Sequence, residues 1–287
     1  MSAATASAVA AAPAVASAPG ITSRIGSWFE DVWVLTRRNL IHIRREPQQL
    51  SDVTIQPILF TLLFVYVFGS SMVISGGTYK EFVVGGLLAM NLTMSSVGTA
   101  IGLSTDLSTG LIDRLRTLPM SQTAILVGRT ISDLFAAMLA AVFVGATALA
   151  IGWRADASLL AVLGGFGIAI LFSYALTWMN ACLGMSVKSP EAAQGVVFII
   201  MFPLAFLSNV FSPTQGMPTW VGAIANWNPV SSVAAACRSL FGNPNPSASV
   251  AAWPMQHPIL ASVAWSIGIM LICVPLAGWL YRRRTSR

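Results

Sequence analysis

Long apolar segments alternate with short polar ones along the chain. A helix needs about 20 predominantly apolar residues to cross the hydrocarbon core of a bilayer. Six segments within residues 47–287 reach that length, and they lie at residues 53–74, 83–105, 123–151, 158–185, 192–211 and 258–281. The pattern therefore predicts an all-α polytopic membrane protein whose six transmembrane helices form one domain.

Positive charge is distributed unequally between the two sides of the predicted spans. If the N-terminus is cytoplasmic, all but three of the 16 Lys and Arg residues fall on cytoplasmic segments, and the exceptions are Lys80, Arg154 and Arg238. Cytoplasmic loops of membrane proteins carry an excess of Lys and Arg, and this excess sets their orientation. Both termini are therefore expected to be cytoplasmic.

Composition indicates the same class of protein. The chain is 55% hydrophobic and only 9% charged, with a mean hydropathy of +0.74, whereas soluble domains are about 25% charged. The net charge of +6 predicts contact with lipid headgroups rather than nucleic acid, because its carriers flank the spans. The preference for Arg over Lys and the many Ala residues are typical of a GC-rich bacterial genome, so we expect a bacterial plasma membrane.

The region before the first span divides into two parts. Residues 1–23 are mostly Ala, Ser, Val and Pro, which bury too little surface to fold, and they predict a disordered cytoplasmic tail. In residues 24–46, helical spacing gathers Trp28 and Trp33 on one face and Arg37 on the other. Such a helix is expected to lie flat in the inner headgroup layer, as an orientation anchor or as a lever that touches a cytoplasmic partner.

The cytoplasmic connection between the second and third spans is longer than a turn requires. It covers residues 106–121, whereas helix–helix connections usually need about 2–8 residues. Its leucines can fill a hydrophobic cleft of a partner, and its arginines can pair with acidic groups at the rim of that cleft. The alternative is an ordinary loop whose arginines only orient the spans. The Gly, Leu, Arg and Pro residues for which the family resemblance given next implies a coupling role are Gly110, Leu111, Arg114, Leu115, Arg116, Leu118 and Pro119.

This connection contains a recognisable motif. Residues 110–121 read Gly-x-x-x-Arg-x-Arg-Thr-Leu-Pro-Met-Ser, and this pattern resembles the corresponding loop of type-2 ABC transporter permeases. In that family the loop forms a short coupling helix that docks into the ATP-hydrolysing subunit. The resemblance implies an exporter permease that works as a homodimer beside two copies of a separate ATP-binding subunit.

A second resemblance lies between the fifth and sixth spans, in residues 212–245. The Pro-, Asn- and Trp-rich sequence there is similar to the outer region of the daunorubicin-resistance type of membrane subunit, which implies short re-entrant helices that cap the outer mouth. Pro218–Trp227 and Val230–Phe241 are each too short to cross a bilayer. A plain extracellular loop is the alternative. The residues assigned to this cap are Pro213, Met217, Pro218, Asn228, Pro229 and Arg238.

The sequence lacks the motifs of the common membrane enzymes and of an ATPase. A phosphate-binding loop needs a Gly directly before its Lys, and neither Lys80 nor Lys188 follows a Gly. The chain has two histidines, His42 and His257, and no His-Glu-x-x-His or Gly-x-Ser-x-Gly motif. We therefore expect a transport subunit without a catalytic site, metal or cofactor of its own, with ATP and Mg²⁺ bound by the partner subunit.

The middle of each predicted span is nearly uncharged. Asp52, Asp106 and Asp133 all lie near inner ends, whereas ion-coupled carriers place ionisable groups deep in the membrane. Gly98 and Gly102 form a Gly-x-x-x-Gly that predicts close helix packing. Polar and aromatic residues that can line a substrate path, with helix packing as the alternative for each, are Asn91, Tyr174, Asn180, Phe206, Ser208 and Asn209.

These expectations combine into one hypothesis about function. The chain is expected to be the permease of an ATP-driven exporter that moves an amphipathic drug or a complex lipid out of the cytoplasm or the inner leaflet. Export of a polysaccharide or glycan precursor is the alternative within this class. An ion-coupled secondary drug transporter is the alternative outside it.

Overall fold

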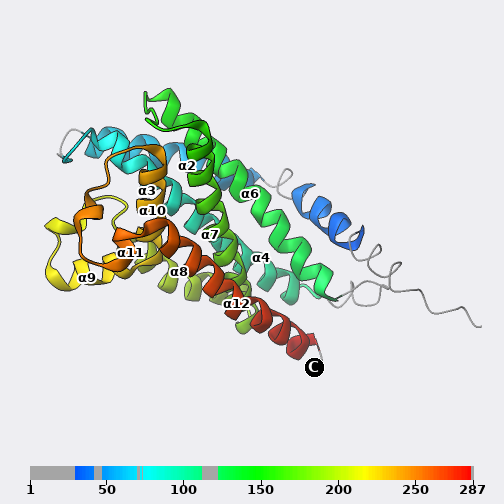
Figure 1. The fold of residues 1–287 in the computed structure, drawn as a ribbon. Helices are drawn as coiled ribbons and strands as arrows, with labels where there is room; N and C mark the ends of the chain where they lie inside the picture. Colours follow the sequence, from blue (N-terminus) through cyan, green and yellow to red (C-terminus); the bar gives the residue numbers. More distant parts are fainter. Residues whose placement is uncertain (1–29, 42–46, 70–71, 73, 112–121, 286–287) are drawn as a thin grey trace, which may run out of the picture.

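The computed structural model describes residues 30–41, 47–69, 72, 74–111 and 122–285, which form a bundle of helices (Figure 1). A first helix covers residues 30–41. The helices that follow it are α2 (Pro47–Leu63), the π-helix η1 (Phe64–Phe68), α3 (Tyr79–Ser95), α4 (Val97–Ser108), α6 (Gln122–Ala150), α7 (Leu159–Ser186), α8 (Pro190–Phe206), η2 (Thr214–Gly216), α9 (Thr219–Trp227), α10 (Pro229–Phe241), η3 (Pro246–Ser249), α11 (Trp253–Gln256) and α12 (Pro258–Thr285).

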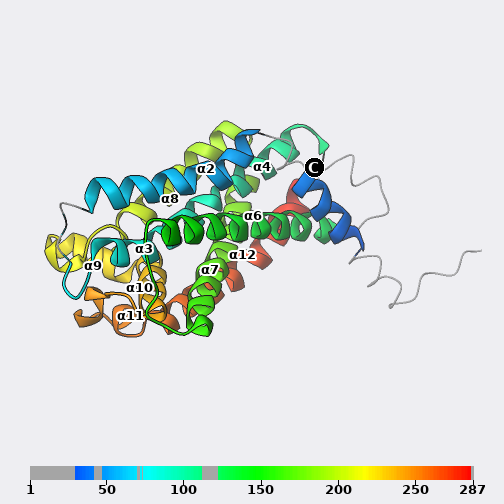
Figure 2. The same ribbon diagram turned by 90° about the horizontal axis from the view of Figure 1, so that it is seen from above.

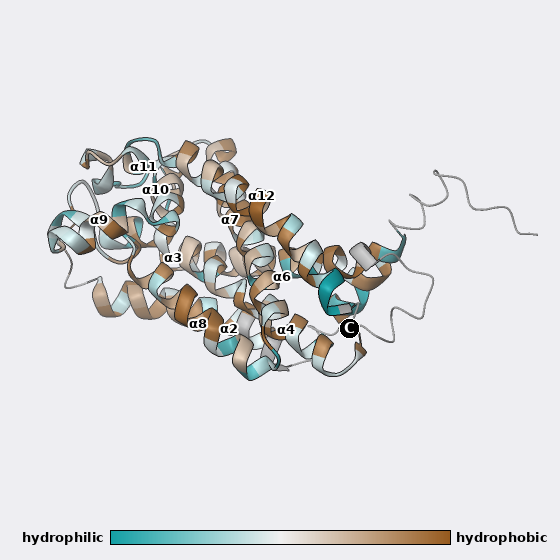
Figure 3. Cartoon of the chain, turned by 90° about the horizontal axis from the view of Figure 1, so that it is seen from below, coloured by the Kyte–Doolittle hydropathy of each residue, from teal (hydrophilic) through white to brown (hydrophobic). Residues whose placement is uncertain are grey.

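All six predicted apolar segments contain helices, which confirms the helical class. Among the described residues, four helices are long and apolar enough to cross a membrane, namely Tyr79–Ser108, Ala124–Ala150, Leu159–Ser186 and Pro258–Arg284. Val53–Phe68 and Pro190–Phe206 are shorter apolar helices. Hydrophobic residues recur along α8 and α12, while hydrophilic residues gather near the C-terminus (Figure 3).

Two of the expected segment ends were wrong. The first apolar helix ends at Phe68 rather than near residue 74, and Ile74 instead forms an isolated antiparallel bridge with Gly77. The fifth ends at Phe206 rather than residue 211. Its last turn contains Pro203. Carbonyl oxygens at the end of the helix accept hydrogen bonds from the side chain of Asn228, as described below.

The α3–α4 segment forms the centre of the bundle. Its most apolar window is 78% buried, against 33% for the windows in α6 and α7 and 22% for that in α12. Close packing around it depends on a small residue, since a Cβ atom at Gly184 of α7 would lie 2.5 Å from the carbonyl oxygen of Ala100 in α4. The other three helices therefore present most of their apolar surface outward, as expected for contact with lipid.

The 30–41 helix packs against the beginning of α6 (Figure 2). Leu35 is buried there, and Thr36 Oγ1 donates to the carbonyl oxygen of Gly128 at 3.3 Å. A Cβ atom at Gly128 would lie 2.9 Å from Leu35 Cβ. Trp33, expected on the apolar face that meets the headgroup layer, is 61% exposed. This helix thus has a protein-facing side against α6; residues 1–29 of the predicted tail and helix lie outside the described residues.

The short helices between α8 and α12 gather at one end of the bundle (Figure 1). The loop after α6 holds them there, because Trp153 Nε1 donates to Asn243 Oδ1 at 2.8 Å and the backbone N–H of Asp156 donates to Phe241 O at 2.9 Å. Gly242 allows the turn at the end of α10 with its positive φ of 69°. The opposite end carries the C-terminus, where Arg284 donates to Val187 O at 2.7 Å.

Candidate functional site

A buried arginine from α10 holds the non-helical segment that follows α8. The Arg238 side chain has 0% exposure. Its Nε donates to Phe82 O at 2.8 Å, Nη1 donates to Asn209 Oδ1 at 3.2 Å, and Nη2 donates to Asn209 O at 2.9 Å and Val210 O at 3.1 Å. Its guanidinium carbon lies 3.7 Å from the centre of the Phe82 ring, close enough for a cation–π interaction. Arg238 therefore joins α3, α10 and the chain after α8.

Two adjacent glycines of α3 make room for this arrangement. A Cβ atom at Gly86 would lie 2.6 Å from Val210 O and 2.9 Å from Arg238 Nη2, and one at Gly85 would lie 3.1 Å from Arg238 Cγ. Arg238 was predicted to lie in the outer cap by resemblance, and no role was predicted for the glycines. Their pairing inside an otherwise bulky helix was the available signal of a close approach.

Two asparagines complete the network around the end of α8. Asn228 Nδ2 donates to the carbonyl oxygens of Leu204 and Leu207, both at 2.7 Å, and Asn228 Oδ1 accepts from the N–H of Val230 at 2.8 Å. One side chain thus hydrogen-bonds the carbonyl groups at the end of α8 and caps the N-terminus of α10. Asn209, at 0% exposure, donates from its backbone N–H to Ser231 Oγ at 2.9 Å.

This network positions Phe211 between two helices. Tyr79 Oη donates to Phe211 O at 3.3 Å, and the Phe211 ring stacks on Phe64 of η1 with 4.2 Å between ring centres. On its other side it contacts Phe206 at 5.5 Å, which stacks on Phe202 at 4.2 Å. The ring of Phe211 therefore bridges the start of η1 and the end of α8.

Six aromatic rings form a connected cluster here, branched at Phe64, which we call the phenylalanine row. Phe64 also stacks on the rings before and after it on the same helical face, at 6.1 Å and 5.3 Å, and neighbouring rings of the row are within 34° of parallel. Phe202 is 51% exposed and Phe206 is 38% exposed. The members of the row are Phe60, Phe64, Phe68, Phe211, Phe206 and Phe202. Its ring faces form an apolar surface with no hydrogen-bonding group.

Comparison with known proteins identifies the class of this helix bundle. The model of the ABC-2 type transporter family matches residues 30–241. The chain belongs to the ABC-2 type transporter family. The matched region runs from the 30–41 helix to the end of α10, so it includes the phenylalanine row and Arg238. The sequence-based assignment to this family is confirmed.

Several relatives in this family are described as transport permeases. The daunorubicin resistance ABC transporter permease protein DrrB1 of Streptomyces coeruleorubidus is 32% identical over 252 residues, which cover 87% of this chain and 85% of the relative. The probable doxorubicin resistance ABC transporter permease protein DrrC of Mycobacterium tuberculosis is 23% identical, covering 88% of both chains. The putative transport permease ycf38 of Cyanophora paradoxa is 25% identical, covering 90% of both. The chain is thus a membrane subunit of the ABC-2 class.

The predicted substrate-path residues lie in different environments. Asn180, Ser208 and Asn209 are buried inside the subunit. Asn180 Nδ2 donates to Ser96 Oγ at 2.8 Å, and Ser208 donates to the carbonyl oxygen of Ala205. The half-buried Asn91 donates to the carbonyl oxygen of the preceding turn at 2.8 Å. The N–H and O–H donors of these side chains are therefore occupied by helix packing in this conformation, whereas the buried Asn180 Oδ1 has no hydrogen-bond partner among the described residues. Phe206 is exposed as part of the phenylalanine row.

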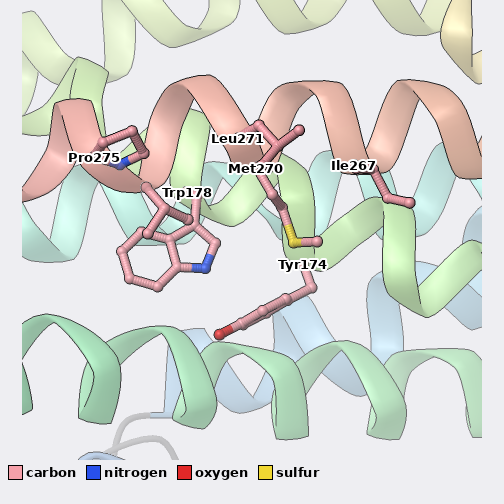
Figure 4. A pocket seen from close by; sticks show the side chains of 7 residues that line it. Tyr174, Trp178, Ile267, Met270, Leu271 and Pro275 are labelled. Carbon is pink, nitrogen blue, oxygen red and sulfur yellow. The ribbon is translucent and has the colours of Figure 1, made fainter.

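Tyr174 lines a separate apolar recess between α7 and α12 (Figure 4). Its volume is about 570 Å³, and its other lining residues are Trp178, Ile267, Met270, Leu271, Val274 and Pro275. Tyr174 and Trp178 project from α7 beside the α12 side chains (Figure 4). The structure thus places Tyr174 and Phe206, predicted on one path, on different apolar surfaces.

The predicted cap residues mark the boundaries of the short outer helices. Pro218 directly precedes α9, and Pro229 is the first residue of α10, a position that suits its fixed φ. Pro213 directly precedes η2 and Met217 directly follows it. The expected short helices are present at 219–227 and 229–241, and their re-entrant placement stays a prediction.

The predicted coupling residues fall at the edge of the described structure. Gly110 follows the end of α4 with a positive φ of 68°, and Leu111 comes next. The remaining members of that set, Arg114, Leu115, Arg116, Leu118 and Pro119, lie outside the described residues. Their role as a docking surface stays a prediction.

Proposed function

We propose that this chain is the membrane-spanning permease of an ATP-driven exporter for an amphipathic drug or a complex lipid. In this proposal it works as a homodimer in a bacterial plasma membrane, with ATP and Mg²⁺ bound by two copies of a separate subunit. Membership of the ABC-2 family supports the class of transporter. The half-exposed phenylalanine row is the observation that supports an apolar or amphipathic cargo.

The proposal includes six membrane spans. The 17 residues of α2 and the 5 of η1 run consecutively, and at about 1.5 Å per residue they extend about 30 Å. The 17 residues of α8 extend about 25 Å on the same basis. Both lengths approach the thickness of a bilayer core, about 30 Å. In the proposal, these two helices therefore form the first and fifth spans, and the four longer helices form the others.

The phenylalanine row suits a cargo with flat or extended apolar parts. Its rings are nearly parallel to their neighbours, so a flat aromatic group can stack on the exposed members. Such contacts contribute about 0.5–1.5 kcal/mol each beyond area burial. Phenylalanine offers no donor or acceptor for sugar hydroxyls, which favours an amphipathic drug or lipid over a polysaccharide.

Efflux measurements in cells test the class of transporter. The chain is expressed alone, with its candidate ATP-binding neighbour, and with a neighbour whose P-loop Lys is replaced by Ala. We expect export of fluorescent amphipathic drugs only with the intact neighbour. Export by this chain alone that stops when the proton gradient is collapsed would contradict the proposal and favour an ion-coupled carrier.

Substitutions in the phenylalanine row test the cargo surface. We expect Phe206→Ala to weaken transport of a flat aromatic drug, with an apparent KM about 2–10 times higher, because one stacking contact of about 0.5–1.5 kcal/mol is lost. Phe198→Ala is the matched control, since Phe198 lies on the same helix, is 43% exposed and has no ring contact in the row. Equal effects of the two substitutions would contradict a specific role for the row.

A further inference from the structure

A cluster of charged side chains connects α4 to α6 close to the segment that joins them. Arg129 of α6 lies between two carboxylates, with Nε 3.3 Å from Asp133 Oδ2 and Nη1 3.8 Å from Asp106 Oδ2. Its Nη2 donates to the carbonyl oxygen of Gly98 at 3.4 Å. Asp133 Oδ2 also accepts from Thr99 Oγ1 at 2.7 Å. Two residues of α6 are thus bonded to three residues of α4.

These charges are largely shielded from solvent. The exposed fractions of the side chains are 19% for Arg129, 28% for Asp106 and 15% for Asp133. Ionisable groups in membrane helices are costly unless they pair with one another or with backbone carbonyls. Asp106 lies in the last turn of α4, and Arg129 lies in the second turn of α6. The cluster therefore joins the end of α4 to the beginning of α6, on either side of the 109–121 connection.

A glycine of α4 provides the space for the guanidinium group. A Cβ atom at Gly102 would lie 2.5 Å from Arg129 Cζ and 2.7 Å from Nη1, whereas a Cβ atom at Gly98 would meet no atom within 4 Å. The Gly-x-x-x-Gly pattern had predicted close helix contact through both residues. Instead, Gly102 accommodates a charged side chain, and Gly98 contributes its backbone carbonyl.

We infer that Arg129 is a positioning residue that makes α4 and α6 move together when the ATP-binding subunit acts on the connection between them. This inference rests on the proposed function. The movement reaches the cargo surface through α4, which packs against both α7 and α8, and α8 carries two members of the phenylalanine row. Without the Arg129 contacts, ATP hydrolysis proceeds but α4 no longer follows α6.

Two glycine substitutions on the same helix provide a matched test. The full chain is purified with its ATP-binding neighbour and reconstituted into vesicles, and ATP hydrolysis and drug transport are measured on the same sample. We expect Gly102→Ala to displace Arg129 and lower the transport per ATP hydrolysed about fivefold or more, the smallest typical effect of coupling between sites. Gly98→Ala is expected to leave this ratio unchanged.

A second variant keeps the test decisive if Gly102→Ala assembles poorly. Arg129→Gln removes the cation without crowding α4, and it is expected to lower the same ratio while the neighbour still copurifies. An unchanged ratio in the complexes that do assemble would overturn the inference, because Arg129 would then contribute only to folding. Equal loss in Gly98→Ala and Gly102→Ala would also overturn it, since that result indicates ordinary glycine packing. Absence of ATP-dependent transport by the unsubstituted chain would instead contradict the proposed function.

Discussion

Arg238 is a buried cation whose described hydrogen-bond partners are all neutral oxygen atoms. Three are backbone carbonyl oxygens and one is the amide oxygen of Asn209. A guanidinium group has five N–H donors in a rigid plane, so it can bond several carbonyls of an irregular segment at once. This property explains why an arginine, rather than a smaller polar residue, suits the place where α8 ends and the chain continues without helical hydrogen bonds.

Removal of Arg238 is expected to destabilise the folded protein. Arg238→Met leaves buried oxygens without a donor, each at a cost of about 1–3 kcal/mol, so we expect a total loss of about 3 kcal/mol or more. Thermal unfolding of the purified protein in detergent measures this loss. Arg38→Met is the control, because Arg38 is exposed and surface substitutions away from specific contacts usually change stability by about 0.5 kcal/mol or less. Similar melting temperatures for the two variants would show that the Arg238 contacts contribute little.

The elements differ in how far the sequence determines them. The expected spans at 123–151 and 158–185 agree with α6 and α7 to within one residue at each end, because their apolar runs are long and end at polar turns. The end of α8 depends on Asn228, 21 and 24 residues further along the chain. Contacts of that separation cannot be read from periodicity, so the fifth segment was predicted too long.

The same distinction applies to the candidate site. The cap boundaries at Pro218 and Pro229 were predicted, since proline acts on its local backbone. The phenylalanine row was not, because its rings come from α2, η1, α8 and the segment after α8. Phe60, Phe64 and Phe68 recur every four residues, which is the one local signal that could have indicated it.

At the level of elements, substitutions of Asn228 can separate its N-cap of α10 from its hydrogen bonds to the end of α8. Asn228→Asp and Asn228→Ser both keep a good N-cap for α10, but both lose the amide NH₂ group that donates to Leu204 O and Leu207 O. The aspartate also places negative charge beside these carbonyls. We therefore expect the Asp variant to be less stable than the Ser variant by about 1 kcal/mol or more, measured by thermal unfolding. Equal stability would mean that only the cap of α10 matters.

For the whole molecule, accessibility to a reagent that cannot cross membranes tests the six-span arrangement. Ser75, Asp156 and Ala223 are exposed and lie in segments expected outside, whereas Lys188 is exposed in a segment expected inside. We expect single cysteines at the first three positions to react in intact cells, and Lys188→Cys to react only after permeabilisation. The native cysteines are buried, so we expect them not to react and the unsubstituted chain to give a low background signal. Reaction of Ser75→Cys only after permeabilisation would contradict a spanning α2–η1 segment.

The beginning of α6 is constrained from two directions by contacts four residues apart. Gly128 and Ser132 accept hydrogen bonds from the 30–41 helix, while Arg129 and Asp133 bond to α4. Most of the rest of α6 presents apolar side chains outward, where one hydrophobic residue can replace another. Natural variation along this helix should therefore be uneven: two turns in which these contacts restrict most positions, followed by five or so in which the outward-facing positions accept many apolar residues while buried positions such as Val144 and Ala148 stay small.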